Sequence, residues 1–380
     1  METPVKTRFV LSLLALILFQ CKPQDTDKKI TEDLEKIQSE FIPDKREKFF
    51  DFEVEKQVIH GKTDQAQIKA AIAEYVAKNA NLTDSIALLP AKELGSDTLA
   101  FVRISVANIR SKPGHSAELS TQALMGTPIR VLDKKGSWYL VQSPDHYLGY
   151  VDSGALSFDN QAFNESKKLV FSQAYGTVHE TQSAGSLPVT DIVFGDLVGE
   201  KGRSGNIVEV AIPGGRSGYL PASQLMELDD YLAQANRNDI ENIAVQLMGV
   251  PYLWGGTSFK GVDCSGFTRT VYMGKGLYIP RDASQQAKVG QRIEVAEDFS
   301  NVQKGDLLFF GRDRDHVTHV ALYLGDKRFI HSSGMVRYAS FDSTAANYDA
   351  YNLKRLLFAQ HLSADDTKLK LNDSSFYSTL

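Results

Sequence analysis

An internal repeat constrains the fold of this 380-residue chain more than any other feature. A set of residues recurs at a constant distance of 69 positions along the chain. The first copy has Gly126, Gly136, Val141, Pro144, Gly149, Tyr150 and Leu156, and the second has Gly195, Gly205, Val210, Pro213, Gly218, Tyr219 and Leu225. Between them lie short β-rich runs such as Trp138–Val141, which turn residues separate. Short strands at this spacing predict two small antiparallel barrels, over residues 98–160 and 166–228.

The sequence becomes helical after the second barrel and then alternates between helix and strand. Asn238 is a good N-cap, and an apolar stripe with helical spacing follows it until Gly249 ends the helix. A second helix is expected from Cys264 to Met273, and strands after it. These strands are Asp306–Phe310, Thr318–Leu324, Phe329–Ser332 and Leu353–Phe358. We therefore expect an α+β domain over residues 229–363 and a polar tail over 364–380.

The first residues are typical of an export signal. Basic residues precede an apolar run from Phe9 to Phe19, which is shorter than the ~20 residues that a membrane-spanning helix needs. The run ends at Cys21 in a sequence that resembles a bacterial lipoprotein signal, although Gln20 replaces the small residue usual before the lipidated cysteine. We expect residues 1–21 to direct export to the cell envelope, with a lipid anchor on Cys21 in the periplasm. An ordinary signal peptide with an incidental cysteine is the alternative.

Residues 22–97, between the signal and the first barrel, are charged and mixed. Helical spacing is present at Ile30, Leu34 and Ile37, and an amphipathic helix is predicted over Ala66–Ala77. We interpret this segment as a tether with a helical portion.

Composition argues against several functions. The net charge of −5 is spread over the chain without a basic stripe, so nucleic-acid binding is not expected. The two cysteines, Cys21 and Cys264, lie in different contexts, so we expect no disulfide. The spacing of His316 and His319 does not converge on a metal in a loop that leads into a strand, and no other Cys/His cluster supplies ligands. We expect neither a metal nor another cofactor.

Cys264 is the candidate nucleophile. Asp263 is a good N-cap for the helix that follows, which places the thiol at the positive end of the helix dipole. This position favours the thiolate, which is the nucleophilic form. For an isolated cysteine, however, a small buried residue in a tight turn is the more common role.

Two histidines supply what a cysteine nucleophile needs, a base and a group that orients the base. His319 and His331 lie on successive predicted strands, joined by the short turn Gly325–Lys327. A hairpin there brings the two rings close together on one side of the sheet. Each histidine alone is more often a structural residue, but the three side chains together indicate a catalytic trio.

The last third of the chain resembles the NlpC-type, papain-like cysteine peptidases of bacterial cell walls. The resemblance lies in Tyr252–Gly256, Asp263–Phe267, Pro280-Arg281, Lys304–Leu307, His319–Tyr323 and Ile330-His331, which occur in the family's order. It implies a papain-like fold with Cys264 as the nucleophile, His319 as the general base and His331 as the third, polar member. The repeat is similar to bacterial SH3-like barrels.

The whole layout resembles the branch of this family that cleaves γ-D-glutamyl–diamino acid bonds in murein peptides with a free N-terminal L-Ala. That resemblance implies that Glu118 contacts the free amine together with Asp263, and that Tyr147 is the barrel tyrosine. It also implies that Tyr252 and Ser265 line the substrate. The family's hydroxyl residue after Pro280-Arg281 is replaced by Ala283 here, and Ser284 is the candidate substitute. From the residues alone, Glu118 is equally well read as a solvated loop charge.

The expected function is hydrolysis of the γ-D-glutamyl–L-diamino acid bond in cell-wall degradation or recycling. One alternative keeps the same trio and makes the protein a D,L-endopeptidase or an amidase that acts on intact peptidoglycan. Another is a non-catalytic lipoprotein that binds the cell wall through its barrels. Acyltransferases with a related Cys/His core are a more distant alternative, because the motif order is that of the peptidases.

Overall fold

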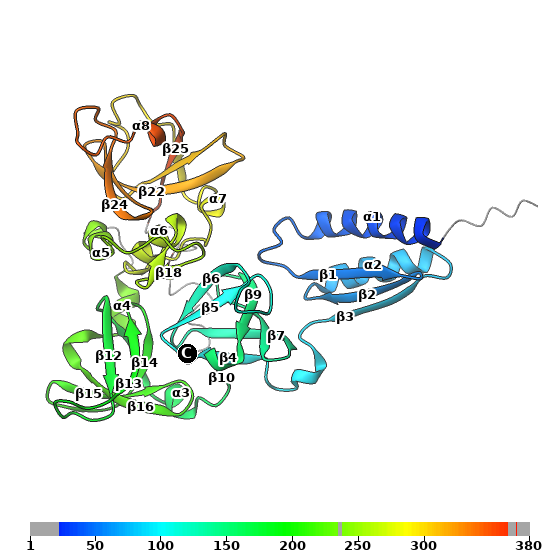
Figure 1. Ribbon diagram of the computed structural model, residues 1–380, viewed down its shortest axis with the longest axis horizontal. Coiled ribbons are helices and arrows are strands. Elements are labelled where there is room, and N and C mark those ends of the chain that lie inside the picture. The colour runs from blue at the N-terminus through cyan, green and yellow to red at the C-terminus, as the bar shows by residue number, and fades with distance from the viewer. Residues whose placement is uncertain (1–22, 235–237, 364–369, 371–380) are drawn as a thin grey trace, which may run out of the picture. The chain divides into compact units, whose positions relative to one another are not determined.

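The computed structural model describes residues 23–234, 238–363 and 370. The predicted signal peptide and Cys21 lie outside the described residues. The chain divides into two compact units (Figure 1). The first joins the residues up to Pro43 with Phe50–Leu88, and the second joins Asp44–Phe49 with the residues from Leu89 onward. No helix among the described residues is long and apolar enough to cross a membrane.

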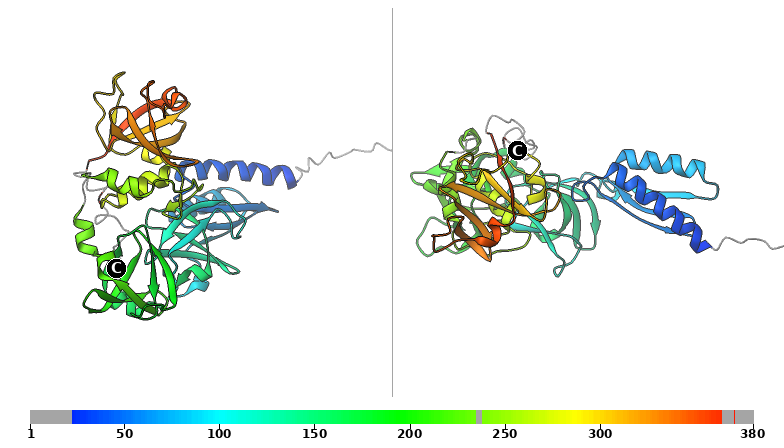
Figure 2. Two further views of the ribbon diagram at one scale, coloured as in Figure 1. Left: turned by 60° about the vertical axis from the view of Figure 1, so that its left-hand side comes forward. Right: turned by 90° about the horizontal axis from the view of Figure 1, so that it is seen from above.

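The first unit is a small α/β domain. Its elements are α1 (Pro23–Phe41), β1 (Phe50–Glu55), β2 (Val58–Thr63), α2 (Ala66–Lys78) and β3 (Thr83–Leu88). β1 and β2 pair antiparallel, whereas α2 forms the crossover that makes β2 and β3 parallel. Both helices lie along the sheet (Figures 1 and 2). Leu34, Ile59 and Ile72, from the helices and the sheet, are fully buried in one hydrophobic cluster.

This domain differs from the tether that we expected over residues 22–97. The two helical patterns were recognised, but the three strands were not. β1 has the sequence FDFEVE, in which every second residue is acidic because one face of the strand is solvated. A short strand of this kind has the same composition as a charged linker, so the sequence alone did not distinguish them.

The first barrel is a seven-stranded sheet with the strand order β10-β4-β7-β8-β9-β5-β6. Its elements are η1 (Lys92–Leu94), β4 (Leu99–Val102), β5 (Val106–Arg110), β6 (Leu119–Leu124), β7 (Pro128–Lys135), β8 (Trp138–Gln142), β9 (Leu148–Asp152), η2 (Ser153–Ala155) and β10 (Leu156–Ser157). Alternate residues of the strands, such as Ile129 and Val131, point into its core. Asp44–Phe49, here called the strap, packs on this barrel through Phe49 and through a hydrogen bond from the Leu148 N–H to the Arg46 carbonyl (2.7 Å).

The second barrel repeats this arrangement strand for strand, in the order β13-β12-β16-β15-β14-β11-β17. Its elements are α3 (Gln161–Glu165), β11 (Lys167–Phe171), β12 (Tyr175–His179), β13 (Pro188–Val193), β14 (Leu197–Ser204), β15 (Ile207–Ile212), β16 (Arg216–Pro221), η3 (Ala222–Gln224) and β17 (Leu225–Glu227). Gly136 and Gly205 form the same turn in the two barrels, with φ of 62° and 56°. Only glycine adopts this backbone conformation without strain, which explains its recurrence.

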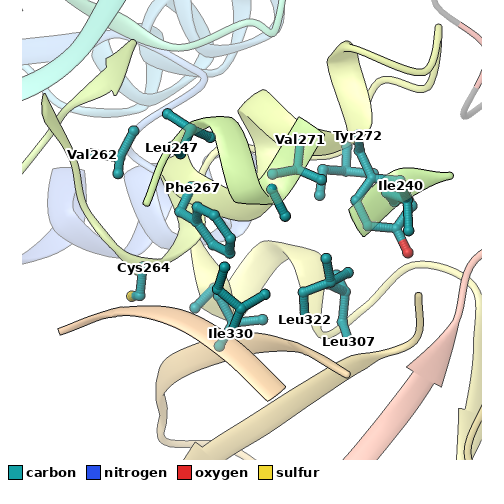
Figure 3. Close-up of a cluster of buried hydrophobic side chains, with 14 of the residues drawn as sticks. Ile240, Leu247, Val262, Cys264, Phe267, Val271, Tyr272, Leu307, Leu322 and Ile330 are labelled. Atoms are coloured by element: carbon teal, nitrogen blue, oxygen red, sulfur yellow. The ribbon is translucent and has the colours of Figure 1, made fainter. Parts of the chain in front are cut away.

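The last domain combines helices with a six-stranded antiparallel sheet of order β20-β25-β21-β22-β23-β24. The helix α4 (Leu228–Ala233) follows the second barrel and connects it to this domain. The elements of the domain are α5 (Ile240–Gln246), β18 (Thr257–Ser258), β19 (Gly261–Val262), α6 (Cys264–Met273), α7 (Ala283–Gln286), β20 (Gln291–Ile293), β21 (Leu307–Gly311), β22 (Val317–Gly325), β23 (Arg328–Ser333), β24 (Met335–Ser340), α8 (Ala350–Leu353) and β25 (Leu356–His361). In β21, Leu307 and Phe309 pack with α6, whereas Leu308 and Phe310 belong to a second core. Figure 3 shows Cys264 at one end of the cluster that α6 forms with the sheet. The predicted fold class, an α+β papain-like domain preceded by SH3-like barrels, is confirmed.

Candidate active site

Cys264 is the first residue of α6, and Asp263 is its N-cap, as the sequence predicted. The Asp263 carboxylate accepts hydrogen bonds from the backbone N–H groups of Gly266 (2.7 Å) and Gly255 (3.0 Å). A Cβ at Gly266 would lie 1.9 Å from the Gly256 carbonyl oxygen, so the first helical turn packs against that loop only because residue 266 is glycine. The local sequence thus fixes the position of the thiol.

The Cys264 thiol is 7% exposed, and its environment favours the protonated form. Burial, followed by the nearby Asp263 carboxylate, raises the pKa of Cys264 to about 12. Backbone hydrogen bonds with Val320 and Ser265 oppose the rise but are weaker. Burial therefore opposes the thiolate that the helix start was expected to favour. Nucleophilic chemistry here requires a base.

The two histidines lie on the hairpin of β22 and β23, as predicted. His319 Nε2 and His331 Nδ1 are 2.9 Å apart, which is a hydrogen-bond distance. The register pairs Leu322 with Ile330, so the two rings meet diagonally on one face of the sheet rather than directly opposite each other. Val320, whose backbone contacts Cys264, is the residue after His319, so strand β22, which carries His319, passes beside the thiol.

Burial keeps both imidazoles neutral near pH 7. It lowers the pKa of His319 to about 3, with His331 as the next cause, and the pKa of His331 to about 4. His331 is completely buried, and its Nε2 has no hydrogen-bond partner among the described residues. A neutral imidazole, unlike a protonated one, is able to accept a proton.

A cavity of about 540 Å³ opens over Cys264. All six side chains predicted to contact substrate line this cavity: Glu118, Tyr147, Tyr252, Asp263, Ser265 and Ser284. They come from loops before β6 and β9 of the first barrel and from three segments of the last domain. The structure thus brings together residues that are widely separated in the sequence.

Arg281 holds Asp263 in place at the floor of this cavity. Its side chain is 1% exposed and donates to both oxygens of the Asp263 carboxylate, at 3.1 and 2.6 Å. It also donates to Ser265 (3.0 Å) and to Thr121 of the first barrel (3.1 Å). The Asp263 carboxylate is therefore already neutralised by a buried guanidinium. Arg281 belongs to the Pro280-Arg281 part of the family pattern, but its sequence context did not indicate this role.

Glu118 lies at the cavity rim, where it accepts a hydrogen bond from Trp254 Nε1–H at 2.7 Å. Both side chains are exposed. Trp254 is another lining residue to which the sequence analysis assigned no role, although it lies within the quoted Tyr252–Gly256 pattern. The first barrel thus presents Glu118 to the same cavity as Cys264.

Tyr147, Asp282, Ser284 and Arg46 form a second polar group on the cavity wall. Asp282 accepts from the Tyr147 hydroxyl (3.2 Å) and from Arg46 Nη1 (2.6 Å). The same Arg46 nitrogen donates to Ser284 Oγ (3.2 Å). Arg46 lies in the strap, a segment that we had assigned to the tether, and no local pattern in the sequence marks it as part of the site.

The first barrel is fixed to the last domain by buried polar contacts. Arg269 of α6 and Asp145 form an ion pair at 2.6 Å, with side chains that are 9% and 4% exposed. Gln122 of β6 contacts Thr257 and Ser258 of β18 by hydrogen bonds of 3.0–3.2 Å. These contacts hold the barrel residues of the cavity at a defined place relative to Cys264.

His316 does not join the site. Its Nδ1 lies 2.6 Å from Asp313 in an exposed loop, where it also contacts Arg312. In the part of the chain that the structure describes, no cluster of three or more His, Cys, Asp or Glu side chains is arranged to hold a metal ion.

Two regions of the chain match known families. Residues 249–355 match the NlpC/P60 family, and residues 109–156 match the bacterial dipeptidyl-peptidase SH3 domain. A protein of Bacillus cereus named γ-D-glutamyl-L-lysine dipeptidyl-peptidase is 34% identical over 232 residues, which cover 57% of this chain and 67% of the relative. The chain belongs to the NlpC/P60 family. Both the predicted family and its enzyme class, a cysteine peptidase, are confirmed.

The chain is also similar to a second curated protein and to a solved structure. Dipeptidyl-peptidase 6 of Lysinibacillus sphaericus is 27% identical over 282 residues, which cover 71% of this chain and 98% of that protein. The crystal structure of an NlpC/P60 family protein from Bacillus cereus superposes with a TM-score of 0.59 at 23% identity, over 69% of this chain and 99% of that one. This likeness shows that the two proteins share the fold.

Proposed function

We propose that this NlpC/P60 protein hydrolyses the γ-D-glutamyl–L-diamino acid bond of peptidoglycan stem peptides that have a free N-terminal L-Ala. The observation that carries the proposal is the shared cavity, in which Glu118 and Tyr147 of the first barrel face the same space as Cys264. The name of the Bacillus cereus relative, which specifies a γ-D-glutamyl-L-lysine dipeptidyl-peptidase, gives further support.

In the proposed mechanism His319 is the general base. Its Nε2–H donates to His331 Nδ1 across the 2.9 Å contact, which leaves the Nδ1 lone pair to accept the Cys264 proton. His331 thus selects the tautomer and orientation of His319. The expected neutrality of both rings at pH 7 suits this role, because a protonated His319 is unable to accept a proton.

The thiolate then attacks the γ-carbonyl carbon and forms a carbon–sulfur bond, while the carbonyl oxygen becomes an oxyanion. Backbone N–H groups at the start of α6, including that of Cys264, are the proposed donors to this oxyanion. Protonated His319 gives its proton to the departing diamino acid nitrogen as the carbon–nitrogen bond breaks. A water molecule, deprotonated by His319, hydrolyses the thioester and restores the thiol.

Selection of the free amine is assigned to the carboxylates of the cavity. An ammonium group that leaves water needs an anionic partner, so a peptide whose L-Ala is still amide-linked to sugar loses this interaction. Glu118 is the stronger candidate for this partner, because Arg281 already neutralises Asp263. Tyr147, Tyr252, Ser265 and Ser284 are proposed to shape the rest of the peptide site.

We also propose that the protein is exported and held in the cell envelope by a lipid on Cys21. Replacement of Cys21 with serine is expected to shift the protein from the detergent-extracted membrane fraction to the soluble fraction of the envelope. Unchanged membrane association of Cys21→Ser would contradict the lipid anchor, without bearing on the peptidase activity.

The peptidase proposal is tested with L-Ala-γ-D-Glu-L-Lys and mass-spectrometric detection of released L-Ala-γ-D-Glu. Cys264→Ala and His319→Ala are expected to abolish release while retaining the circular dichroism spectrum and melting temperature of a folded protein. His331→Asn keeps a hydrogen-bond acceptor for His319 and is expected to lose less activity than His331→Ala. Full activity in Cys264→Ala would contradict the mechanism, and equal rates on intact sacculi and free tripeptide would favour the D,L-endopeptidase or amidase alternative.

A further inference from the structure

We propose that Arg46 of the strap is a substrate-binding residue that takes the α-carboxylate of the D-glutamyl residue. This inference rests on the proposed function, because it assigns a partner to one group of that substrate. Arg46 lies outside both regions that match known families, residues 109–156 and 249–355.

The strap is anchored on both sides of the cavity. On the first barrel, the Leu148 N–H donates to the Arg46 carbonyl (2.7 Å) and Gln142 Nε2 donates to the Glu47 carbonyl (2.8 Å). On the last domain, Gln285 of α7 donates to the side chains of Asp44 (3.1 Å) and Glu47 (2.7 Å). These contacts fix the backbone of residue 46, so its side chain reaches the cavity from a defined position.

Arg46 has an orientation and a charge that suit carboxylate recognition. The Asp44 carboxylate accepts hydrogen bonds from Arg46 Nε and Nη2, at 2.7 and 2.5 Å, and thereby fixes the orientation of the guanidinium plane. Nη1 then points to Asp282 and Ser284. A guanidinium has five N–H donors, of which these contacts with described residues use four. Arginine is the side chain best suited to a planar carboxylate.

Among the described residues that line the cavity, only Arg46 and Arg281 are cationic. The Arg281 side chain is 1% exposed and is occupied by Asp263, Ser265 and Thr121. The Arg46 side chain is 33% exposed. Arg46 pairs with Asp44 and Asp282, but these contacts leave one Nη2–H without a partner among the described residues. Arg46 is therefore the partly exposed cationic side chain that has a donor left for a substrate carboxylate.

The position of Arg46 favours the D-glutamyl carboxylate over that of the diamino acid. Arg46 and Tyr147 share Asp282, which places the guanidinium beside the barrel residues assigned to the L-Ala-γ-D-Glu part of the substrate. The contact with Ser284 also puts Arg46 next to Ala283, where the hydroxyl residue of the resembled family is missing. Glu118 and Arg46, which line the same cavity, match the ammonium and the carboxylate of one L-Ala-γ-D-Glu unit.

The test compares two tripeptides that differ only at this carboxylate, L-Ala-γ-D-Glu-L-Lys and the same peptide with the D-glutamyl α-carboxyl converted to an amide. Full-length Arg46→Met, Arg46→Lys and wild type are assayed for cleavage of the γ bond. Lys45→Met is the matched control, because Lys45 is an exposed strap cation that does not line the cavity. Melting temperatures establish that each variant is folded.

Wild type is expected to prefer the carboxylate peptide. Arg46→Met is expected to raise KM for that peptide roughly tenfold to a hundredfold, the range of a lost charged hydrogen bond, and to change kcat/KM for the amide peptide little. Arg46→Lys is expected to keep a reduced preference, and Lys45→Met the full preference.

Two results would overturn the inference while leaving the proposed function intact: an unchanged carboxylate preference in Arg46→Met, or an equal loss on both peptides, which would indicate a purely structural role. If Arg46→Met does not fold, Arg46→Lys decides, and an unchanged preference there overturns the inference. Failure of wild type to cleave either peptide would overturn the proposed function, and the Arg46 assignment with it.

Discussion

The two barrels of this protein share a strand order but carry different residues at the positions that matter for the cavity. Glu118 of the first barrel corresponds to Leu187 of the second, and Tyr147 corresponds to Arg216. Leu187 is exposed to solvent, and Arg216 donates to the backbone carbonyl of Arg103. In the part of the chain that the structure describes, the barrel residues that line the cavity over Cys264 come from the first barrel.

The residues that recur between the barrels are those that form turns and cores. Gly136 and Gly205 make equivalent turns, and Val141 and Val210 are both completely buried. The repeat therefore reports how the barrels fold, whereas the differences between the copies report what each barrel does. The two copies of the scaffold share their packing, and among the described residues that line the cavity over Cys264 the barrel residues belong to the first copy.

The largest expected difference between the barrels concerns their attachment to the last domain. Asp145→Ala in the first barrel leaves Arg269 buried without its partner and is expected to lower the free energy of unfolding by about 3–5 kcal/mol. Asp191→Ala in the second barrel removes a partly exposed pair with Lys260 and is expected to cost no more than about 1 kcal/mol. Urea unfolding of both variants measures the two losses. Equal losses would contradict the difference in attachment.

The pH dependence of stability is expected to distinguish the two histidines of the hairpin from the Asp145–Arg269 ion pair of the barrel, because the two contributions are lost at different pH values. Burial lowers the pKa of His319 to about 3 and of His331 to about 4, from 6.5 when unfolded. The unfolded chain therefore binds more protons below pH 6.5, and stability falls as the pH is lowered from there towards the folded values, by about 2 kcal/mol for each histidine between pH 7 and 5. Urea unfolding at a series of pH values measures this loss, which His331→Asn is expected to reduce.

The contribution of Asp145 to the stability of the fold is lost at a lower pH than that of the two histidines. Its pKa is held below 3.8 by Arg269, against the opposing and larger single effect of burial. A carboxylate with a lowered pKa stabilises the fold above its unfolded pKa and loses that effect as the pH falls through the folded value. The difference between wild type and Asp145→Ala is thus expected to persist at pH 5 and to shrink only below pH 3.8. A loss of this difference already at pH 5 would contradict the assignment.

The smallest expected effect concerns the support of Glu118. Trp254→Phe removes one hydrogen bond to the Glu118 carboxylate and is expected to raise KM for the free tripeptide by a few-fold, from about 1 kcal/mol of lost positioning. Tyr175→Phe in the second barrel removes a hydroxyl that donates to the Phe259 carbonyl, away from the cavity, and is expected to leave KM unchanged. Steady-state kinetics measure KM for both variants. An equal rise in KM for the two would contradict the role proposed for Trp254.

Local sequence was sufficient to predict the elements that carry the candidate catalytic residues. The N-cap at Asp263 and the hairpin that carries His319 and His331 are each determined by residues close in the chain. The repeat was likewise visible as a constant spacing. These features could be predicted because turns, caps and hairpins are short-range structures.

The electrostatics and the long-range contacts of the site could not be predicted in this way. The raised pKa of Cys264 follows from burial that only the folded chain provides. Arg46 meets Asp282 across 236 positions of sequence, and the strap that carries it has the composition of a linker. The residues that line the wall of the cavity were therefore predicted only where the pattern of the resembled family included them.

The central claim is that the first barrel, through Glu118, selects peptides with a free N-terminal amine. It is tested most directly by kcat/KM on L-Ala-γ-D-Glu-L-Lys and on its N-acetylated form, for wild type, Glu118→Gln and the matched second-barrel variant Leu187→Gln. Wild type and Leu187→Gln are expected to prefer the free amine roughly tenfold to a hundredfold, and Glu118→Gln is expected to lose most of that preference. An unchanged preference in a folded Glu118→Gln variant would contradict the claim.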